Sequence, residues 1–377
     1  MAGIYIHIPF CKQKCSYCDF HFSTSFEAYR SQMIEALLLE IDQRSHYIDK
    51  SESINSIYFG GGTPSLLTFE ELTAILTKIN HHFSVNLDCE RTLEANPDDI
   101  QIESLAAWKK SGINRLSIGL QSFKKADLEW MNRAHSVEES YSCVALAQSM
   151  GFENLTVDLM YGLPHLTNKE WENHIQQVIK MGVTHISAYC LTVEEKTELN
   201  ALVKAGKISP ASEDTQSEQF TILVDTLEKN GFIHYEISNF CKPNYQAIHN
   251  SNYWKGENYL GIGPSAHSYN QVSRAWNVRN NREYIRKVNL NESYFETEIL
   301  TPEDRFNELL LTGLRTNFGV PILKLSKCLE IPATFWKEIQ LFTDQQLLFI
   351  ENDTLFLTKK GKLQADKIAS DLFQIKP

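Results

Sequence analysis

The sequence predicts an α/β protein, consisting of a partial (β/α)6 TIM-like barrel followed by a small C-terminal winged-helix-like domain. Three observations lead to this fold class. Short β-rich runs alternate with amphipathic stretches up to about residue 192. Polar residues stand at or just after the ends of five successive strands. From Thr301 the composition changes to Leu-rich helices followed by two short strands.

Six strand units account for the alternation. Strands are predicted at residues 3–8, 56–59, 91–95, 115–120, 155–160 and 184–191. Helical spacing of apolar residues predicts helices at about 27–47, 69–83, 105–108, 126–131 and 169–181. Strands that alternate with helices run parallel and are joined by right-handed crossovers. A doubly wound sheet is the alternative, but it would concentrate the polar groups at one switch point.

Beyond Thr192 the alternation weakens. A helix is expected over residues 213–229 and a strand over 233–237, before an aromatic stretch at 249–269. Near the end, short strands are expected at 348–350 and 354–357, around the turn Asn352-Asp353. We therefore predict three parts: residues 1–200 as the barrel, 201–294 as a linking region and 295–377 as the C-terminal domain.

Composition excludes several classes of protein. The 377 residues are 42% hydrophobic and 22% charged, which excludes disorder and collagen-like structure. The 36 Lys and Arg against 47 Asp and Glu leave a net charge of -11, so no nucleic-acid partner is expected. No apolar run approaches the roughly 18 residues of a membrane span, and the start reaches Cys11 without a cationic leader. We expect a cytoplasmic protein.

The eight cysteines are unevenly distributed. Cys11, Cys15 and Cys18 stand close together. The other five are scattered singly, at Cys89, Cys143, Cys190, Cys241 and Cys328. A chain of this size can build a core without disulfides, so reduced thiols or metal ligands are expected. The triple spacing arises by chance in roughly 0.4% of such chains, given a cysteine frequency of about 0.02. Cys190 falls in an apolar strand and is expected in the core.

The three clustered cysteines indicate an iron–sulfur site. Three thiolates on one short loop can hold three irons of a [4Fe-4S] cluster and leave the fourth iron without a protein ligand. A zinc site is the alternative, but zinc sites usually pair cysteines as two separated C-x-x-C knuckles. We therefore predict Cys11, Cys15 and Cys18 as the metal ligands.

The cysteine loop CKQKCSYC, at residues 11–18, resembles the signature of radical S-adenosylmethionine (SAM) proteins. Five more segments extend the resemblance over nearly the whole chain: YIHIPF at 5–10, GGGTP at 60–64, EANP at 94–97, GLQSF at 119–123 and DLMYGLP at 158–164. Together they resemble the oxygen-independent coproporphyrinogen III oxidase family. The resemblance implies a radical SAM barrel, in which one electron from a [4Fe-4S] cluster cleaves the carbon–sulfur bond of SAM.

Within that family the sequence is most similar to the haem-chaperone branch. The oxidase has a fourth cysteine two residues after the third, where this chain has Phe20. The oxidase also has a longer amino-terminal segment, whereas ten residues precede Cys11 here. Residues 249–254, HNSNYW, match the H-N-x-x-Y-W motif associated with the chaperone branch.

The resemblance also implies which residues contact SAM. Gly61, Gly62 and Thr63 would let the backbone approach the methionine end and offer N–H groups to it. Four polar side chains near the barrel mouth would contact SAM: Glu94, Gln121, Arg133 and Asp158. Two tyrosines, Tyr5 and Tyr17, would pack around the cluster and the adenine of SAM. Taken singly, such carboxylates often cap helices or face solvent, and a glycine run often makes only a tight turn.

His249 is the candidate haem ligand, because neutral imidazole commonly binds haem iron and Tyr253 and Trp254 could line an apolar slot. A histidine beside aromatic residues is also often a hydrogen-bonded core group, and Cys241 and His267 are competing ligands.

The resemblance implies a haem chaperone that binds haem, a [4Fe-4S] cluster and SAM and passes haem to acceptor proteins, membrane-bound ones included. An electron donor and a homodimer are further expected partners. The alternative is an oxygen-independent coproporphyrinogen III oxidase, which decarboxylates propionate side chains by hydrogen abstraction. A degenerate scaffold without a cluster is a third reading, which the intact cysteines and SAM positions disfavour.

Overall fold

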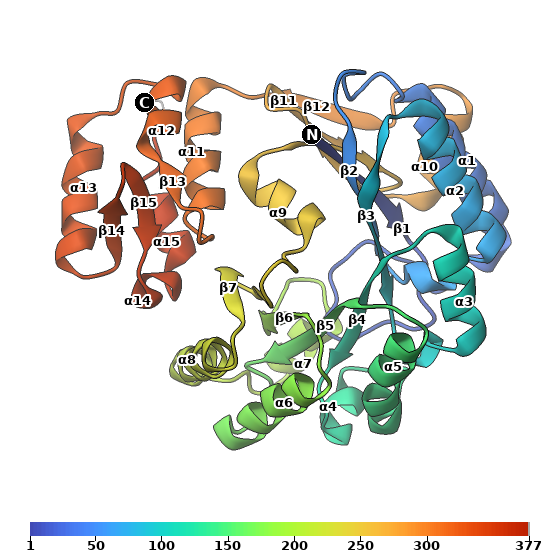
Figure 1. The fold of residues 1–377 in the computed structure, drawn as a ribbon, viewed down its shortest axis with the longest axis horizontal. Helices are drawn as coiled ribbons and strands as arrows, with labels where there is room; N and C mark the ends of the chain where they lie inside the picture. Colours follow the sequence, from blue (N-terminus) through green and yellow to red (C-terminus); the bar gives the residue numbers. More distant parts are fainter. Residues whose placement is uncertain (376–377) are drawn as a thin grey trace.

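The computed structural model describes residues 1–375 of the chain. Within them the strands form a twelve-stranded sheet, in the order β12-β11-β10-β9-β1-β2-β3-β4-β5-β6-β8-β7, and a three-stranded sheet, in the order β13-β15-β14. Helices flank the larger sheet, and the smaller sheet lies in a separate body at the C-terminal end (Figure 1). This is the α/β architecture that the sequence predicts.

Six parallel strands form the centre of the larger sheet. They are β1 (Ala2–Ile8), β2 (Ile54–Gly61), β3 (Val85–Ala95), β4 (Arg115–Gln121), β5 (Asn154–Tyr161) and β6 (His185–Cys190). Each pairs in parallel with the next in sequence order. Parallel neighbours joined through helices place all six carboxyl ends at one edge, where the site of such a fold lies.

Helices connect the strands. They are α1 (Arg30–Gln43), α2 (Phe69–His82), α3 (Ile102–Ser111), α4 (Lys125–Trp130), α5 (Val137–Ser149) and α6 (Asn168–Lys180). Capping boxes start α2, α5 and α6, in which Thr68, Ser136 and Thr167 each exchange hydrogen bonds with a glutamate three residues later. Each such N-cap typically stabilises its helix by about 1 kcal/mol.

Several element boundaries differ from the sequence prediction, and two of these differences have a visible cause. The strand predicted at 91–95 is longer, because β3 begins at Val85, where polar residues and the exposed Leu87 obscure the apolar pattern. The helix predicted at 27–47 is shorter, since a 3-10 turn (Glu27–Tyr29) precedes α1 and α1 ends at Gln43. Two more 3-10 turns, η2 (Pro64–Leu66) and η3 (Pro97–Asp99), follow β2 and β3.

Both edges of the large sheet come from residues after β6. Beside β1 lie β9 (Asn258–Ile262), β10 (His267–Tyr269), β11 (Ser273–Asn277) and β12 (Phe295–Ile299), and beside β6 lie β8 (Asn239–Cys241) and β7 (Ile233–Glu236). Only β9 joins in parallel; the other five pair antiparallel. The same stretch contributes α7 (Glu198–Lys204), α8 (Glu213–Lys229), α9 (Ile248–Lys255) and α10 (Asn281–Asn289).

The C-terminal body has its own apolar core, which includes Phe306, Leu325, Phe335 and Leu355. Its elements are α11 (Pro302–Gly313), β13 (Val320–Pro321), α12 (Ile322–Cys328), α13 (Ala333–Asp344), β14 (Leu348–Glu351), β15 (Thr354–Leu357), α14 (Lys359–Lys362) and α15 (Ala365–Asp371). The division at residues 200 and 295 stays a prediction, and residues 376 and 377 of the predicted C-terminal domain lie outside the described residues.

The hairpin of the C-terminal body has the turn that the sequence predicts. Asn352 and Asp353 link β14 to β15 and both have positive φ, 47° and 56°. Two consecutive left-handed residues form the turn whose twist matches a tight hairpin, and Asn and Asp tolerate that conformation best after glycine.

Candidate functional site

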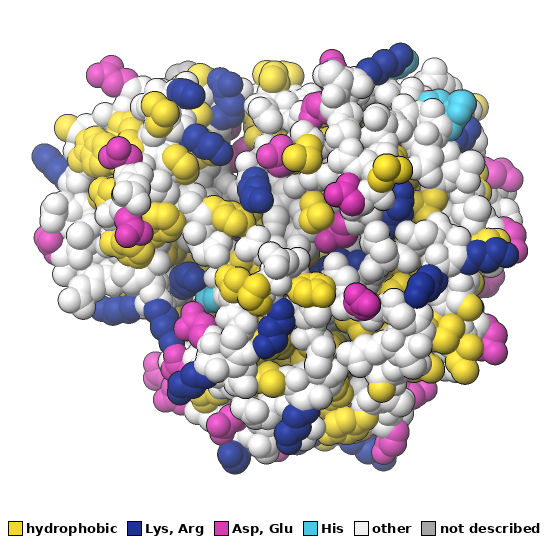
Figure 2. Space-filling view, in the orientation of Figure 1, with side chains coloured by type: hydrophobic (Ala, Val, Ile, Leu, Met, Phe, Trp, Pro, Cys, Tyr) yellow, Lys and Arg dark blue, Asp and Glu magenta, His cyan; other side chains and the backbone are white. Residues whose placement is uncertain are grey.

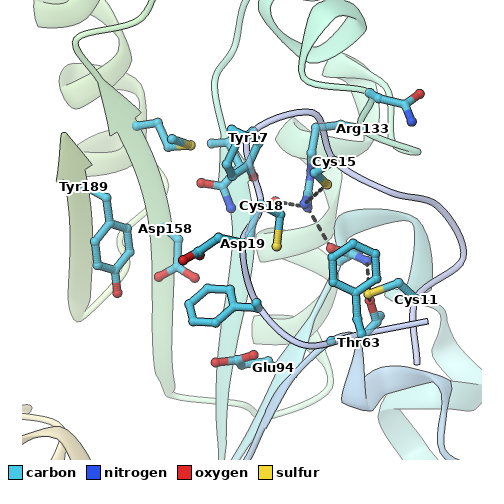
Figure 3. Close-up of a pocket in the computed structure, with 18 of the residues that line it drawn as sticks. Cys11, Cys15, Tyr17, Cys18, Asp19, Thr63, Glu94, Arg133, Asp158 and Tyr189 are labelled. Atoms are coloured by element: carbon cyan, nitrogen blue, oxygen red, sulfur yellow. Dashed lines mark hydrogen bonds between the residues drawn. The ribbon is translucent and has the colours of Figure 1, made fainter. Parts of the chain in front are cut away.

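A cavity of about 460 Å³ opens at the carboxyl ends of the six parallel strands. Figure 3 shows side chains from several strands and from the loop after β1 pointing into it. Eleven of the predicted site residues line this cavity: Cys11, Cys15, Tyr17, Cys18, Gly61, Gly62, Thr63, Glu94, Gln121, Arg133 and Asp158. Tyr5 and His249 do not; they lie together in a second cavity.

The cysteine loop follows β1 directly and presents three half-buried thiols to the cavity. Thr63 Oγ1 donates to Cys11 Sγ (3.5 Å), and Arg133 Nη1 donates to Cys15 Sγ (3.5 Å). Burial raises the pKa of Cys11 to about 12 and that of Cys18 to about 11, so a metal must displace their protons to bind.

A [4Fe-4S] cluster fits this loop better than a single metal ion does. Within residues 1–375 no three His, Cys, Asp or Glu side chains are arranged around one ion. A cluster does not need that convergence, because each thiolate binds a different iron. Three thiols spread along the rim of one cavity suit a cluster that leaves its fourth iron facing the cavity.

A network of hydrogen bonds anchors the cysteine loop to its neighbours. Lys12 Nζ donates to Asp98 (2.7 Å) and also contacts Asp99, both in the 3-10 turn after β3. On the other side, Asn132 Nδ2 donates to the backbone oxygen of Lys14 (2.7 Å). The loop is therefore held at Lys12 and at Lys14 by segments that follow β3 and β4.

The glycine run makes a close backbone approach rather than an open set of donors. Gly61 has φ 104°, and a Cβ on Gly62 would stand 2.5 Å from the Phe10 oxygen. The Gly62 and Thr63 amides donate to the oxygens of Ile8 (2.9 Å) and Phe10 (2.6 Å). These two N–H groups are thus already hydrogen-bonded to Ile8, which ends β1, and to Phe10 beyond it. The contact of the glycine run with SAM stays a prediction.

Two half-buried carboxylates face the cavity, Glu94 from one residue before the end of β3 and Asp158 from three residues before the end of β5 (Figure 3). Burial raises the pKa of Glu94 to about 7, and the nearby charge of Asp158 adds to that rise. Burial also raises the pKa of Asp158 to about 6, although hydrogen bonds from the Ser187 and Ser117 hydroxyls oppose the rise. Tyr58 donates its hydroxyl hydrogen to Glu94 Oε1 (2.7 Å). Carboxylates held in a buried cavity favour a cationic ligand, which offsets the cost of their burial.

Arg133 and Gln121 complete the rim. Arg133 Nη2 donates to Asn96 Oδ1 (2.7 Å) and to the Gly119 oxygen (2.9 Å). Gln121 has φ 66°, a conformation that ends β4 and turns the side chain at the cavity wall. A Cβ on Gly119 would lie 2.9 Å from Gln121 Nε2, so glycine makes room for this amide.

Sequence reasoning missed several residues of the cavity wall. Asn96 belongs to the EANP segment, but no contact was predicted for it from the sequence. Tyr189 and Leu191 also line the cavity, and their only signal is their place at the end of the sixth strand. Cys190, expected in the core, packs against the core but is half-buried and lines the cavity as well, so that expectation was incomplete.

The second cavity, about 180 Å³, lies deeper in the barrel and contains Tyr5 and His249. His249 is 3% exposed, its Nδ1 is hydrogen-bonded to the Ser56 hydroxyl (2.9 Å) and its Nε2 to the Tyr253 hydroxyl (3.0 Å). Burial lowers the pKa of His249 to about 3, so the ring is neutral. Tyr5 bonds through its hydroxyl to His7 Nδ1 (3.1 Å).

Haem does not fit this second cavity as it stands, since sites for drug-sized ligands occupy roughly 300–1,000 Å³. Both ring nitrogens of His249 are engaged, so ligation of iron requires at least one hydrogen bond to break. Of the competing ligands, Cys241 is fully buried in β8 and His267 is exposed on β10. The haem ligand stays a prediction.

Comparisons with known proteins agree along the whole chain. Residues 5–178 match the model of the radical SAM superfamily, and residues 300–363 match that of the HemN C-terminal domain. Heme chaperone HemW of Bacillus subtilis (strain 168) is 32% identical, with 98% of each chain covered. Heme chaperone HemW of Lactococcus lactis subsp. lactis (strain IL1403) is 33% identical, with 95% of this chain and 93% of that protein covered. The chain belongs to the HemW family of radical SAM proteins.

A solved structure confirms the fold of this HemW-family chain. Coproporphyrinogen III oxidase (HemN) from Escherichia coli superimposes with a TM-score of 0.84 over 99% of this chain and 90% of that one, at 21% identity. Membership of the radical SAM superfamily implies a [4Fe-4S] cluster and SAM, which together supply one-electron chemistry. The three thiols and the half-buried carboxylates are the groups that would hold them.

SAM affinity should rise with pH between 5.5 and 8. SAM carries a sulfonium and an ammonium, and the cavity gains negative charge as Asp158 and Glu94 ionise through their pKa values of about 6 and about 7. Glu94→Gln should lower affinity at pH 8 by roughly tenfold, or ~1.4 kcal/mol, and flatten the upper part of the profile. Equilibrium dialysis of cluster-loaded protein measures this, with the exposed Glu129→Gln as control; a flat wild-type profile would contradict it.

Stability of the protein without SAM should change with pH in the opposite direction. The pKa values of Glu94 and Asp158 in the folded protein are higher than the pKa of ~4 that a carboxyl has in an unfolded chain. The folded state therefore binds the protons of these two carboxyls more tightly than the unfolded state does. Their contribution to the free energy of unfolding is therefore complete below about pH 4 and is lost as pH rises through 6 to 7. Urea melts at several pH values should show a smaller loss for Glu94→Gln than for wild type.

Lys12→Met should make the cluster easier to remove. The substitution removes the contacts of Lys12 to Asp98 and Asp99, which hold the cysteine loop near Cys11. A partly buried ion pair of this kind stabilises a structure by up to ~1 kcal/mol. The cluster absorbance should therefore bleach about fivefold faster in an iron chelator. Lys14→Met, an exposed change in the same loop, should bleach at the wild-type rate, and equal rates for both variants would refute the anchor.

Proposed function

We propose that this protein is a haem chaperone, which binds haem in addition to the [4Fe-4S] cluster and SAM and passes haem to acceptor proteins. The observation that carries the proposal is the full-length similarity to proteins named as heme chaperones, at 32% and 33% identity. Phe20 supports it, because this 68% exposed side chain stands at the cavity where the oxidase is expected to have a fourth cysteine.

An oxygen-independent coproporphyrinogen III oxidase is the second candidate. The complete radical SAM cavity favours it, since the thiols and the two carboxylates are all present around one space. The fold shared with the Escherichia coli oxidase does not distinguish the two functions, because one fold supports different activities.

The proposal includes partners and a compartment. It requires haem-acceptor proteins, membrane-bound ones included, and an electron donor for the cluster, and it includes a homodimer. All eight cysteines lie in the described part of the chain as free thiols, which fits the reducing cytoplasm. Within residues 1–375 no helix has both the length and the hydrophobicity of a membrane span. Acidic and basic side chains intermingle on the face shown in Figure 2.

Haem titration tests the proposal directly. Wild-type protein should give a saturable change in the Soret absorbance. His249→Ala should shift the Soret band and weaken binding, whereas His267→Ala should do neither. A thermal melt of each variant controls for misfolding, because His249→Ala leaves the Ser56 and Tyr253 hydroxyls without their partner. Absence of a Soret change in wild type would refute the chaperone proposal.

Anaerobic turnover separates the two candidate functions. Cluster-loaded protein incubated with SAM, reductant and coproporphyrinogen III should leave the propionate side chains intact, as mass spectrometry would show. Cys11→Ala, which removes one cluster ligand, is the blank for radical chemistry. A decarboxylated product from wild type and none from Cys11→Ala would favour the oxidase.

A further inference from the structure

The H-N-x-x-Y-W segment docks α9 against the barrel. His249 Nδ1 is hydrogen-bonded to the Ser56 hydroxyl of β2, and Asn250 Nδ2 donates to the Tyr235 hydroxyl (3.1 Å). The other hydrogen bond of His249, to Tyr253, lies within α9. Asn252 Nδ2, within the same segment, donates to Asn55 Oδ1 (2.8 Å) and to Ser56 Oγ (3.2 Å). The polar side chains of this segment are therefore used to hold one short helix in place.

Strand β3 caps the beginning of α9. Ala247 precedes the helix and supplies no side-chain cap. Glu90 replaces it, since its carboxylate accepts the N–H groups of Ile248 and His249, both at 2.9 Å, while Arg115 Nε lies 3.8 Å from it. An eight-residue helix is unstable by itself, so α9 depends on these contacts with the barrel.

The docking of α9 is also imperfect. Ser251 Oγ and Trp254 Nε1 are buried without a hydrogen-bond partner among residues 1–375. Each such group carries the full cost of its desolvation. A helix that carries such unsatisfied buried groups is more readily displaced than one whose buried polar groups are all paired.

Tyr58 joins the two cavities. Its hydroxyl donates to Glu94 in the SAM cavity (2.7 Å), and its ring stacks on that of His249 with centroids 5.0 Å apart and planes 20° apart. Tyr58 lines the second cavity but not the SAM cavity, and Ser117 and Tyr189 line both. One side chain thus touches a residue predicted to contact SAM and the residue at the centre of the α9 contacts.

We propose that Tyr58 is a positioning residue that couples occupancy of the SAM cavity to the docking of α9. A cation beside Glu94 holds that carboxylate in its present place, which in turn holds the Tyr58 ring against His249. By linkage, a docked α9 strengthens SAM binding by the same factor. If the proposed function holds, haem ligation through His249 Nε2 requires release from Tyr253, so SAM disfavours it.

Hydrogen exchange tests the coupling without haem, so its outcome is independent of the chaperone proposal. In cluster-loaded wild type, saturating SAM should slow amide exchange in peptides covering residues 248–255 by about fivefold, the lower end of typical couplings. Tyr58→Phe keeps the ring but removes the hydroxyl, and at its own saturating SAM concentration it should lose this protection. The control is Tyr259→Phe, whose ring packs edge-on against Tyr253 and lines neither cavity; it should keep the protection.

If Tyr58→Phe does not fold or does not saturate with SAM, the coupling is tested in the opposite direction, through the effect of α9 on SAM affinity. Tyr253→Phe, which removes a hydrogen bond of His249 in the second cavity, should then weaken SAM binding about fivefold in equilibrium dialysis. Where both variants fold, the double variant should bind SAM no more weakly than Tyr58→Phe alone. Any of three results would overturn the coupling. These are amide exchange at residues 248–255 of wild type that SAM leaves unchanged, full protection of these residues by SAM in Tyr58→Phe, and wild-type SAM affinity in Tyr253→Phe.

Discussion

The end of β2 lies so close to the start of the cysteine loop that only glycine fits there. A Cβ on Gly62 would stand 2.5 Å from the Phe10 oxygen, and a Cβ on Gly61 would stand 2.5 Å from the His7 ring. Because no side chain intervenes, the amide of Gly62 reaches the carbonyl of Ile8, which ends β1, and that of Thr63 reaches the carbonyl of Phe10. This contact sets the direction in which the cysteine loop leaves the barrel, and the placement of the three thiols over the strand ends depends on it.

Buried polar groups are the second feature of the barrel interior. Glu94 and Asp158 near the mouth have raised pKa values, since burial disfavours their charged forms. Deeper in the barrel, His249 has a lowered pKa for the same reason and stays neutral between two hydroxyls. The mouth therefore favours a cation, whereas the deeper cavity contains a neutral ring that is already hydrogen-bonded.

Strand order made much of the site predictable. Gln121 ends β4, Glu94 stands one residue before the end of β3, and Asp158 stands three residues before the end of β5. The carboxyl ends of parallel strands meet at one edge, so the proximity of these residues followed from the alternation of elements. Tyr5 stands three residues before the end of β1, as Asp158 does in β5, but it lines the second cavity rather than the one that contains the thiols. Its contact with SAM stays a prediction. The antiparallel strands at both sheet edges were mostly missed, because three- to five-residue strands leave little periodic signal.

The sequence by itself determined the chemistry available to this protein. Three cysteines at fixed spacing predict a cluster, and the segments around them indicate the family, because local spacing on one loop survives without knowledge of the fold. Only the tertiary structure decided how distant residues are used. It paired Tyr58 with both Glu94 and His249. It also showed that the polar residues of the H-N-x-x-Y-W motif hold α9 against the barrel. These contacts between distant residues depend on which side of each strand faces the barrel interior and on which side chains pack there. The spacing of residues along the chain specifies neither of these.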